Sequence, residues 1–100
     1  MNTILKEIDG NMVAILEGRL DTAASPETEK AMQPLFDCEN KDIILDCTKL
    51  DYISSSGLRI FLMVLKNAKP KGCRVYIQGL NDDLRQVFAM TGFTNLFEFK

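Results

Sequence analysis

Three consecutive serines, Ser54, Ser55 and Ser56, are the residues whose type and spacing could carry chemistry in this chain. They stand just before Gly57 and a strongly apolar segment with helical spacing. A serine at such a position can cap the helix by accepting a hydrogen bond from a first-turn amide, which contributes about 1 kcal/mol. A phosphate on one of them would also be well placed, because free amides and the helix dipole favour an anion there. The residues alone leave both roles open.

A nucleophilic serine is disfavoured by what surrounds these residues. The chain contains no histidine, so no imidazole is available as the base of a serine or cysteine nucleophile pair. The GxSxG elbow is absent, and no serine is followed by a lysine three residues later. The lack of histidine also removes the commonest transition-metal ligand. We therefore expect a protein that is not an enzyme and that holds no metal and no cofactor.

Length, charge and cysteine usage limit the class of protein further. One hundred residues with 46% hydrophobic side chains suit a single globular domain over residues 1–100. The 14 acidic and 12 basic residues argue against a nucleic-acid surface, which needs clustered cations. Three cysteines without a CxxC pair indicate neither a disulfide scaffold nor a zinc site. The longest apolar run, residues 60–65, is about a third of a membrane span, so we expect no membrane partner and a cytoplasmic location.

The beginning of the chain predicts a β-hairpin. Residues 3–8 and 12–18 are apolar and strand-like, and Asp9-Gly10 stands between them. An Asp-Gly pair in this setting favours a type I′ turn, because that turn needs positive φ and glycine supplies it.

A helix is expected over residues 26–36. Ser25-Pro26 supplies a capping residue followed by proline at the first helical position. Pro34 interrupts the pattern, so we expect a kink or a broken last turn there. The residues assigned to its inner face are Ala31, Met32, Leu35 and Phe36.

The rest of the chain alternates strand and helix patterns. Residues 42–47 (DIILDC) are typical of a strand covered on both faces, and residues 48–57 follow as a loop. A helix over 57–69 is expected to bury Leu58, Phe61, Leu62, Leu65 and Ala68. The remaining elements are a strand at 73–77, a helix at 82–91 and a short edge strand at 96–99.

This order, β-β-α-β-α-β-α-β, predicts an α/β fold. Strands that alternate with helices after a hairpin imply a mixed sheet, parallel in its centre, with helices packed on it. In sheets of this kind, sites form beyond the carboxyl ends of the strands, which is where the serine loop is expected.

The serine segment also resembles the STAS domain family, specifically the bacterial anti-sigma factor antagonists. The resemblance starts from IILDCTKLDYISSSGLR, which matches the family's apolar strand, acidic residue, aromatic and Ser-Ser-Gly-Leu pattern. GRLDTA, residues 18–23, is similar to the family's Gly-x-Leu-Asp element. Residues 80–99 are similar to its closing helix, glycine and strand. The three motifs occur in the family's order and span nearly the whole chain.

The resemblance implies a STAS-like domain that acts by partner switching. In the family, the unmodified antagonist binds an anti-sigma factor that is also a serine kinase of the histidine-kinase-like ATPase type, and so frees a sigma factor. The kinase phosphorylates the serine two residues before the motif glycine, and a PP2C-type phosphatase reverses this. That serine maps to Ser55, with Ser56 and Gly57 after it and with Ser54 where the family has an aspartate.

The same resemblance assigns a partner-binding role to Asp21 and Thr22. Asp21 matches the acidic residue of the Gly-x-Leu-Asp element, which the family fold brings near the acceptor serine. A carboxylate there would repel a phosphate on Ser55. The alternative is that Asp21 is a turn or cap residue ahead of the first helix. Gly57 likewise has two structural explanations, a close approach of helix to sheet or a permissive backbone at the turn.

The helix after the serines carries more apolar residues than one stripe requires. Ile60, Met63 and Val64 lie outside the inner face assigned above. Either neighbouring helices cover them, or they form a partly exposed patch beside the serine loop that contacts the partner.

Two further functions compete with a phosphorylated antagonist. One is a STAS scaffold or adaptor subunit, in a lipid-transport or stressosome-like complex, that is never phosphorylated; Ser54 in place of the family aspartate favours it. The other is a receiver domain that accepts phosphate on Asp46 at a strand end. The paired acids that a receiver needs after its first strand are missing.

Overall fold

A mixed β-sheet forms the frame of the molecule in the computed structural model, which describes residues 1–37 and 39–100. Cys38, one of the three cysteines, lies outside the described residues. The sheet order is β1-β2-β3-β4-β5; β1 is antiparallel to β2, and the other neighbours are parallel. This confirms the α/β fold with a sheet that is parallel in its centre. The strands are Asn2–Ile8, Asn11–Leu20, Ile43–Ile53, Val75–Gln78 and Glu98–Phe99.

The hairpin between β1 and β2 forms at the predicted turn. Ile8 pairs with Asn11, and the two residues between them, Asp9 and Gly10, have φ angles of 52° and 80°. Two consecutive positive φ values define a type I′ turn, whose twist matches that of the strands. The turn sets the register of β1, which is an edge strand.

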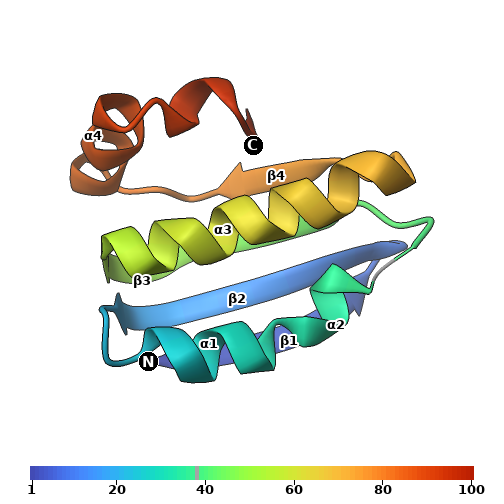
Figure 1. Cartoon of the computed structure of the whole chain (residues 1–100), viewed down its shortest axis with the longest axis horizontal. Helices are drawn as coiled ribbons and strands as arrows, with labels where there is room; N and C mark the ends of the chain where they lie inside the picture. The colour runs from blue at the N-terminus through green and yellow to red at the C-terminus, as the bar shows by residue number, and fades with distance from the viewer. Residues whose placement is uncertain (38) are drawn as a thin grey trace.

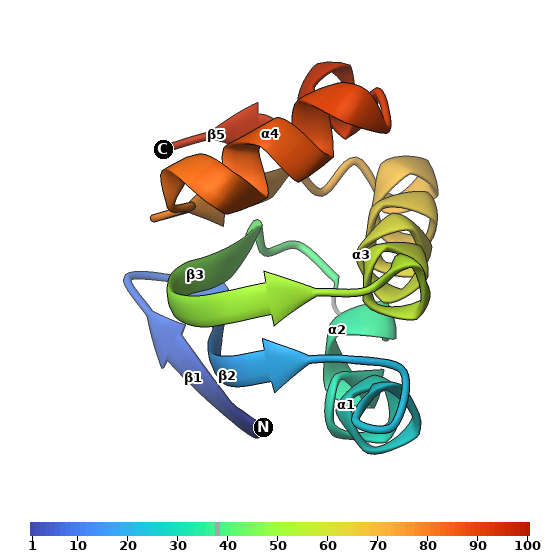
Figure 2. The ribbon, with the colours of Figure 1, turned by 90° about the vertical axis from the view of Figure 1, so that its left-hand side faces the viewer.

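The helices lie mainly on one side of this sheet. In Figure 2, α1, α2 and α3 cover one face of β1–β3, whereas α4 lies beside β4 and β5 at the upper edge. Figure 1 shows α3 running along β3. Among the described residues no helix covers the opposite face of β1–β3. The burial expected on both faces of the strand at 42–47 is nevertheless confirmed for Ile43, Ile44, Leu45 and Cys47, whereas Asp46 is partly exposed. The helices are α1 (Ser25–Ala31), α2 (Gln33–Phe36), α3 (Ser55–Ala68) and α4 (Asp82–Met90), with short 3-10 turns η1 (Lys69–Lys71) and η2 (Phe93–Asn95).

The predicted helix over 26–36 divides into α1 and α2. The break falls at Met32, and Pro34 stands in the first turn of α2, where its missing N–H costs no hydrogen bond. This confirms the interruption expected from Pro34. Met32, Leu35 and Phe36 are buried as expected, but Ala31 is exposed because α1 ends there.

Strand β3 is the largest departure from the sequence prediction. It runs to Ile53, so most of the segment expected as a loop over 48–57 is strand. Its pairing with β2 shifts register twice, between Ile15 and Glu17 and between Gly18 and Arg19. Each shift leaves an unpaired residue on β3, which breaks the strict alternation of inward and outward side chains. The strand therefore ends at Ile53, with only Ser54 between it and the first residue of α3.

The hydrophobic core lies between the sheet and the helices. Phe61 of α3 and Phe88 of α4 are fully buried, with ring centroids 6.1 Å apart. Of the inner face predicted for the helix over 57–69, which is α3, Leu62 alone is only partly buried. No helix among the described residues has the length and apolar character needed to cross a membrane.

Candidate functional site

The site is built where β2 and β3 end side by side. Leu20 and Ile53 are the last paired residues of these parallel strands. The backbone N–H of Ser54 then donates to the carbonyl of Leu20 at 2.8 Å, which extends the pairing one step beyond the strand. The residues that follow, Asp21 on one chain segment and Ser54 on the other, are thus held at the same edge of the sheet. Figure 2 shows the carboxyl ends of β2 and β3 side by side.

Ser54 fills the capping role. Its backbone is extended, with φ −89° and ψ 171°, and its side-chain oxygen accepts a hydrogen bond from the backbone N–H of Gly57 at 3.2 Å. The residue is 8% exposed. An aspartate, which the resemblance to the STAS family implies at this position, also caps helices through a side-chain oxygen. Ser54 therefore keeps the hydrogen-bonding function of the acid without its charge.

Ser55 has the opposite character. It is the first residue of α3 and is exposed, and its hydroxyl makes no hydrogen bond to any other described residue. Ser56 is half-buried beside it. Neither Ser55 nor Ser56 shares the cap or makes a side-chain hydrogen bond to another described residue, and of the three serines Ser55 is the most exposed.

Gly57 is required by a close approach between α3 and the sheet. A Cβ at this position would lie 2.7 Å from Cγ of Leu20 and 2.8 Å from Cγ1 of Ile53. Both neighbours are core side chains, and protein cores accommodate extra methyl groups poorly. Gly57 does not adopt positive φ, so of the two structural explanations the close approach is confirmed.

Asp21 acts as a cap for the turn that enters α1. Its carboxylate oxygen Oδ1 accepts a hydrogen bond from the backbone N–H of Ala24 at 2.9 Å. Its carbonyl accepts from both the N–H and the hydroxyl of Ser25, at 3.1 and 2.9 Å. The turn alternative is thereby confirmed, and a further role in partner binding stays a prediction.

An open groove of about 300 Å³ separates α1 from α3 next to these residues. Thr22 lines it from the β2–α1 turn, and Ser56 lines it from the first turn of α3. The groove also carries Glu29 and Arg59, two charged residues that the sequence analysis did not select. Arg59 follows Ser55 by four residues, a spacing that places both on one helix face and that could have identified it.

The patch expected from Ile60, Met63 and Val64 is corrected by the packing of α3. Ile60 and Val64 are 2% and 0% exposed and belong to the core. The cause is α1 and α2, which pack against α3 on that side. Met63 is partly buried against the same cluster. An exposed apolar surface formed by all three residues is therefore wrong.

The other reactive groups among the described residues do not form a second site. Asp46 lies in the middle of β3, and its Oδ1 accepts hydrogen bonds from the N–H and hydroxyl of Thr48, at 3.0 and 2.6 Å. Burial raises the pKa of the Cys47 thiol, and the Asp46 carboxylate raises it further, so this thiol is a poor nucleophile. The described residues contain no cluster of three His, Cys, Asp or Glu side chains that could hold a metal ion.

The comparisons with known proteins agree with this geometry. The STAS domain family model matches residues 2–100. The chain is 32% identical to a putative anti-sigma factor antagonist, BtrV, of Bordetella bronchiseptica, over 97% of this chain and 84% of that protein. An anti-sigma factor antagonist structure from Mycobacterium paratuberculosis superposes with a TM-score of 0.88 at 18% identity, covering 98% of this chain and 83% of that one. The phosphorylated form of the Bacillus cell fate determinant SpoIIAA superposes with a TM-score of 0.75 at 20% identity, covering 99% and 91%.

Proposed function

Because the chain belongs to the STAS domain family of anti-sigma factor antagonists, we propose that it acts by partner switching through Ser55. In this proposal the unphosphorylated protein binds an anti-sigma factor, which is also a serine kinase of the histidine-kinase-like ATPase type. Binding releases a sigma factor. Phosphate transfer from ATP to Ser55 ends the interaction, and a PP2C-type phosphatase restores the binding form.

The exposed, unbonded hydroxyl of Ser55 is the observation that carries this proposal. A kinase needs a hydroxyl that can enter its active site, and Ser54 is buried in its cap whereas Ser55 is not. The phosphoryl group would replace only the hydroxyl proton of Ser55. No hydrogen bond between described residues has to break for that transfer.

Electrostatics explains how the modification could act without refolding the domain. A phosphoserine carries about −1.5 to −2 charges at pH 7, and the first turn of α3 is a favourable place for them. Arg59, one turn further on, adds a cation on the same helix face. The fold therefore tolerates the phosphate, while a partner surface that fits the neutral Ser55 meets a new double charge.

The groove between α1 and α3 is the surface we assign to the partner. It includes Ser56, the residue after Ser55, and Thr22, for which a partner-binding role is predicted above. Asp21, held by its hydrogen bond from Ala24, immediately precedes Thr22, and its carboxylate would repel a phosphate on Ser55.

A phosphorylation assay tests the proposal. The protein is incubated with ATP and each histidine-kinase-like ATPase encoded in the same genome, and the phosphate is mapped by mass spectrometry. We expect one phosphate on Ser55 with at least one kinase, unchanged in a Ser56→Ala variant and lost in Ser55→Ala. Removal of that phosphate by a PP2C-type phosphatase supports the return step.

A STAS scaffold or adaptor subunit remains the second candidate, and Ser54 is the residue that favours it. The neutral cap removes a negative charge that family kinases meet beside the acceptor serine. If every kinase leaves Ser55 unmodified while the protein still forms a stable complex with other subunits, the scaffold function replaces the switch.

A further inference from the structure

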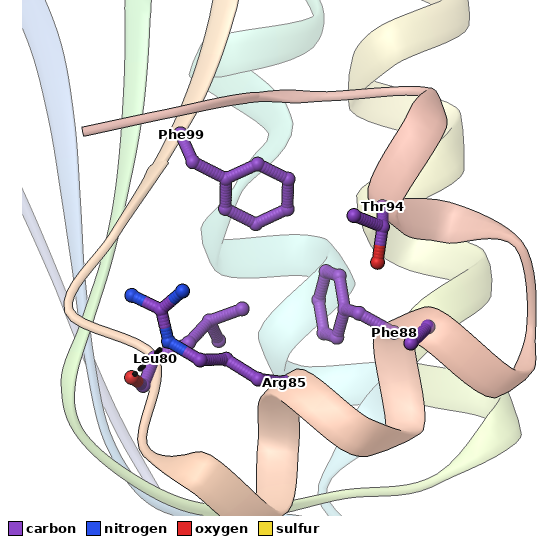
Figure 3. Close-up of a pocket in the computed structure, with 6 residues that line it drawn as sticks. Leu80, Arg85, Phe88, Thr94 and Phe99 are labelled. Carbon is purple, nitrogen blue, oxygen red and sulfur yellow. Dashed lines mark hydrogen bonds between the residues drawn. The ribbon is translucent and has the colours of Figure 1, made fainter.

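A small pocket between α4 and the C-terminal strand lies apart from the serine groove and has a lining of its own. Its volume is about 180 Å³, roughly the space of six water molecules. Leu80, Phe88, Ala89 and Phe99 form its apolar walls, and Arg85 and Thr94 are its polar members (Figure 3). One charged group over an apolar cavity is the pattern of a binding site for a small amphipathic molecule.

The aromatic walls of the pocket are held by the core. Phe88 is fully buried, and its ring packs edge-on against Phe99 at a centroid distance of 6.4 Å and an interplanar angle of 74°. Phe93 supports the same ring at 6.0 Å. Phe99 is 37% exposed, so it forms the outer wall. An aromatic or aliphatic group of one ring's size would bury apolar surface against these walls, since the two rings contact each other and line the same space.

Arg85 is fixed at the mouth of the pocket by the loop between β4 and α4. Its Nε donates to the carbonyl of Leu80 at 3.2 Å, and Figure 3 shows the guanidinium between Leu80 and Phe99. Among the described residues it takes part in none of the ion pairs. The bond through Nε leaves the two terminal nitrogens free, which is the edge that binds a carboxylate through two parallel hydrogen bonds.

The loop that carries Leu80 is itself rigid. Gly79 has φ +79°, and a Cβ there would lie 3.0 Å from Cα of Thr48 on β3, so this segment is pressed against the sheet. Asn81 caps α4 by accepting from the N–H of Leu84 at 2.8 Å and also donates to the carbonyl of Leu50 at 3.5 Å. The anchor of Arg85 is thus organised before any ligand arrives, which lowers the cost of binding.

We propose that this pocket binds a small monocarboxylate with an apolar body of about one ring, its carboxylate on Arg85 and its body against the walls formed by Leu80, Phe88 and Phe99. The site is independent of Ser55 and of the partner-switching function. It gives the molecule a second binding surface on α4 and β5, which contain none of the residues assigned to the switch.

Phenylacetate is a suitable probe, with the neutral phenylacetamide as its matched control. In a titration followed by two-dimensional NMR, we expect saturable shifts of Ala89, Thr94 and Phe99 with a Kd on the order of 1–10 mM, the range for a ligand of this size. Phenylacetamide should bind at least about tenfold more weakly, since it cannot form the charged pair.

Three variants complete the test. Arg85→Gln should weaken phenylacetate at least about tenfold. Ala89→Leu, on an exposed helix position, should block binding by filling the pocket while leaving the charge in place. Arg59→Gln, which removes an equal charge beside the serine groove, should leave the affinity unchanged. Equal affinity for phenylacetate and phenylacetamide, an unchanged Arg85→Gln variant, or no saturable shift would overturn the proposal.

Discussion

The backbone N–H of Ser54 donates to the carbonyl oxygen of Leu20 at 2.8 Å, one step beyond the last paired residues of β2 and β3. This bond ties the start of α3 to the end of β2. It places the buried cap residue Ser54 directly before the exposed Ser55, and it brings Leu20 under Gly57. The predictions below depend on this arrangement.

Replacing Gly57 by alanine should destabilise the fold. The new methyl group meets Leu20 and Ile53 at less than 3.0 Å, and overpacking of a core costs about 1–3 kcal/mol. That cost exceeds the gain of up to about 1 kcal/mol expected when alanine replaces glycine in a helix. Urea unfolding measures the difference. Ser56→Ala, in the same helical turn, is the control and should stay within about 0.5 kcal/mol; a Gly57→Ala variant as stable as wild type would contradict the close approach.

Removing the Ser54 cap should lower the free energy of unfolding, and an aspartate at the same position should restore most of the loss. Ser54→Ala leaves the N–H of Gly57 without its partner and should lower the free energy of unfolding by about 1 kcal/mol. Ser54→Asp should recover most of this loss, because a carboxylate also caps and interacts favourably with the helix dipole. Ser55→Ala serves as the comparison, since Ser55 makes no such bond, and should change stability by less than about 0.5 kcal/mol. Equal effects of the two alanine variants would show that Ser54 is not the cap.

A negative charge at residue 55 should abolish partner binding without unfolding the protein. We expect Ser55→Asp to bind the anti-sigma factor at least about tenfold more weakly than wild type, a difference of about 1.4 kcal/mol. Its melting temperature should stay near that of wild type, because the acid stands in the first turn of α3. Calorimetric titration and thermal melts give the two numbers. The uncharged Ser55→Asn variant separates charge from size, and retained tight binding by Ser55→Asp would contradict the switch.

The buried thiol of Cys47 should make stability fall at high pH. Burial raises the pKa of this thiol above its ordinary value of 9.0, so above about pH 9 the unfolded chain releases a proton that the folded protein keeps. The folded state then binds more protons, and the free energy of unfolding decreases with rising pH, by up to about 1.4 kcal/mol per pH unit. This contribution is fully present below pH 9.

Comparison with Cys47→Ala isolates the effect from the other groups that titrate in the same range. The variant should be less stable at pH 7, since it leaves a small cavity, but its stability should decline less steeply between pH 9 and pH 10.5. Parallel curves for the two proteins would show that Cys47 does not stay protonated in the fold.

Local sequence signals predicted most of the elements. Asp9-Gly10 indicates its own turn because the required backbone angles are a property of those two residues. Pro34 likewise predicts the division of the helix, since its missing N–H disrupts any helix that contains it. The parallel centre of the sheet follows from the alternation of strands and helices, which leaves few other arrangements.

The length of β3 could not be predicted from local sequence signals. Its second half contains Lys49, Asp51 and Tyr52, which are exposed, and buried Leu50 and Ile53 are three residues apart. Two register shifts against β2 produce that spacing. A bulge depends on the partner strand, so a search for alternation along one segment finds a loop instead.

The sequence predicted which residues form the site, but not which role each serine has. Single-residue chemistry treats Ser54, Ser55 and Ser56 alike, whereas the bond from Gly57 to Ser54 decides which is buried. The same limit applies to Ile60 and Val64, since their burial depends on where α1 and α2 pack. The burial of these residues depends on contacts between segments that are distant in sequence, so local patterns do not predict it.

The separation of the cap at Ser54 from the hydroxyl at Ser55 has a consequence for how much of the protein a cell maintains. Proteases and chaperones act on the unfolded fraction, which follows the free energy of unfolding. Since a change at Ser55 leaves the cap intact and a negative charge suits the first turn of α3, phosphorylation should not raise the unfolded fraction. Degradation would then not remove the phosphorylated form selectively, and its level would depend on the enzymes that act on Ser55.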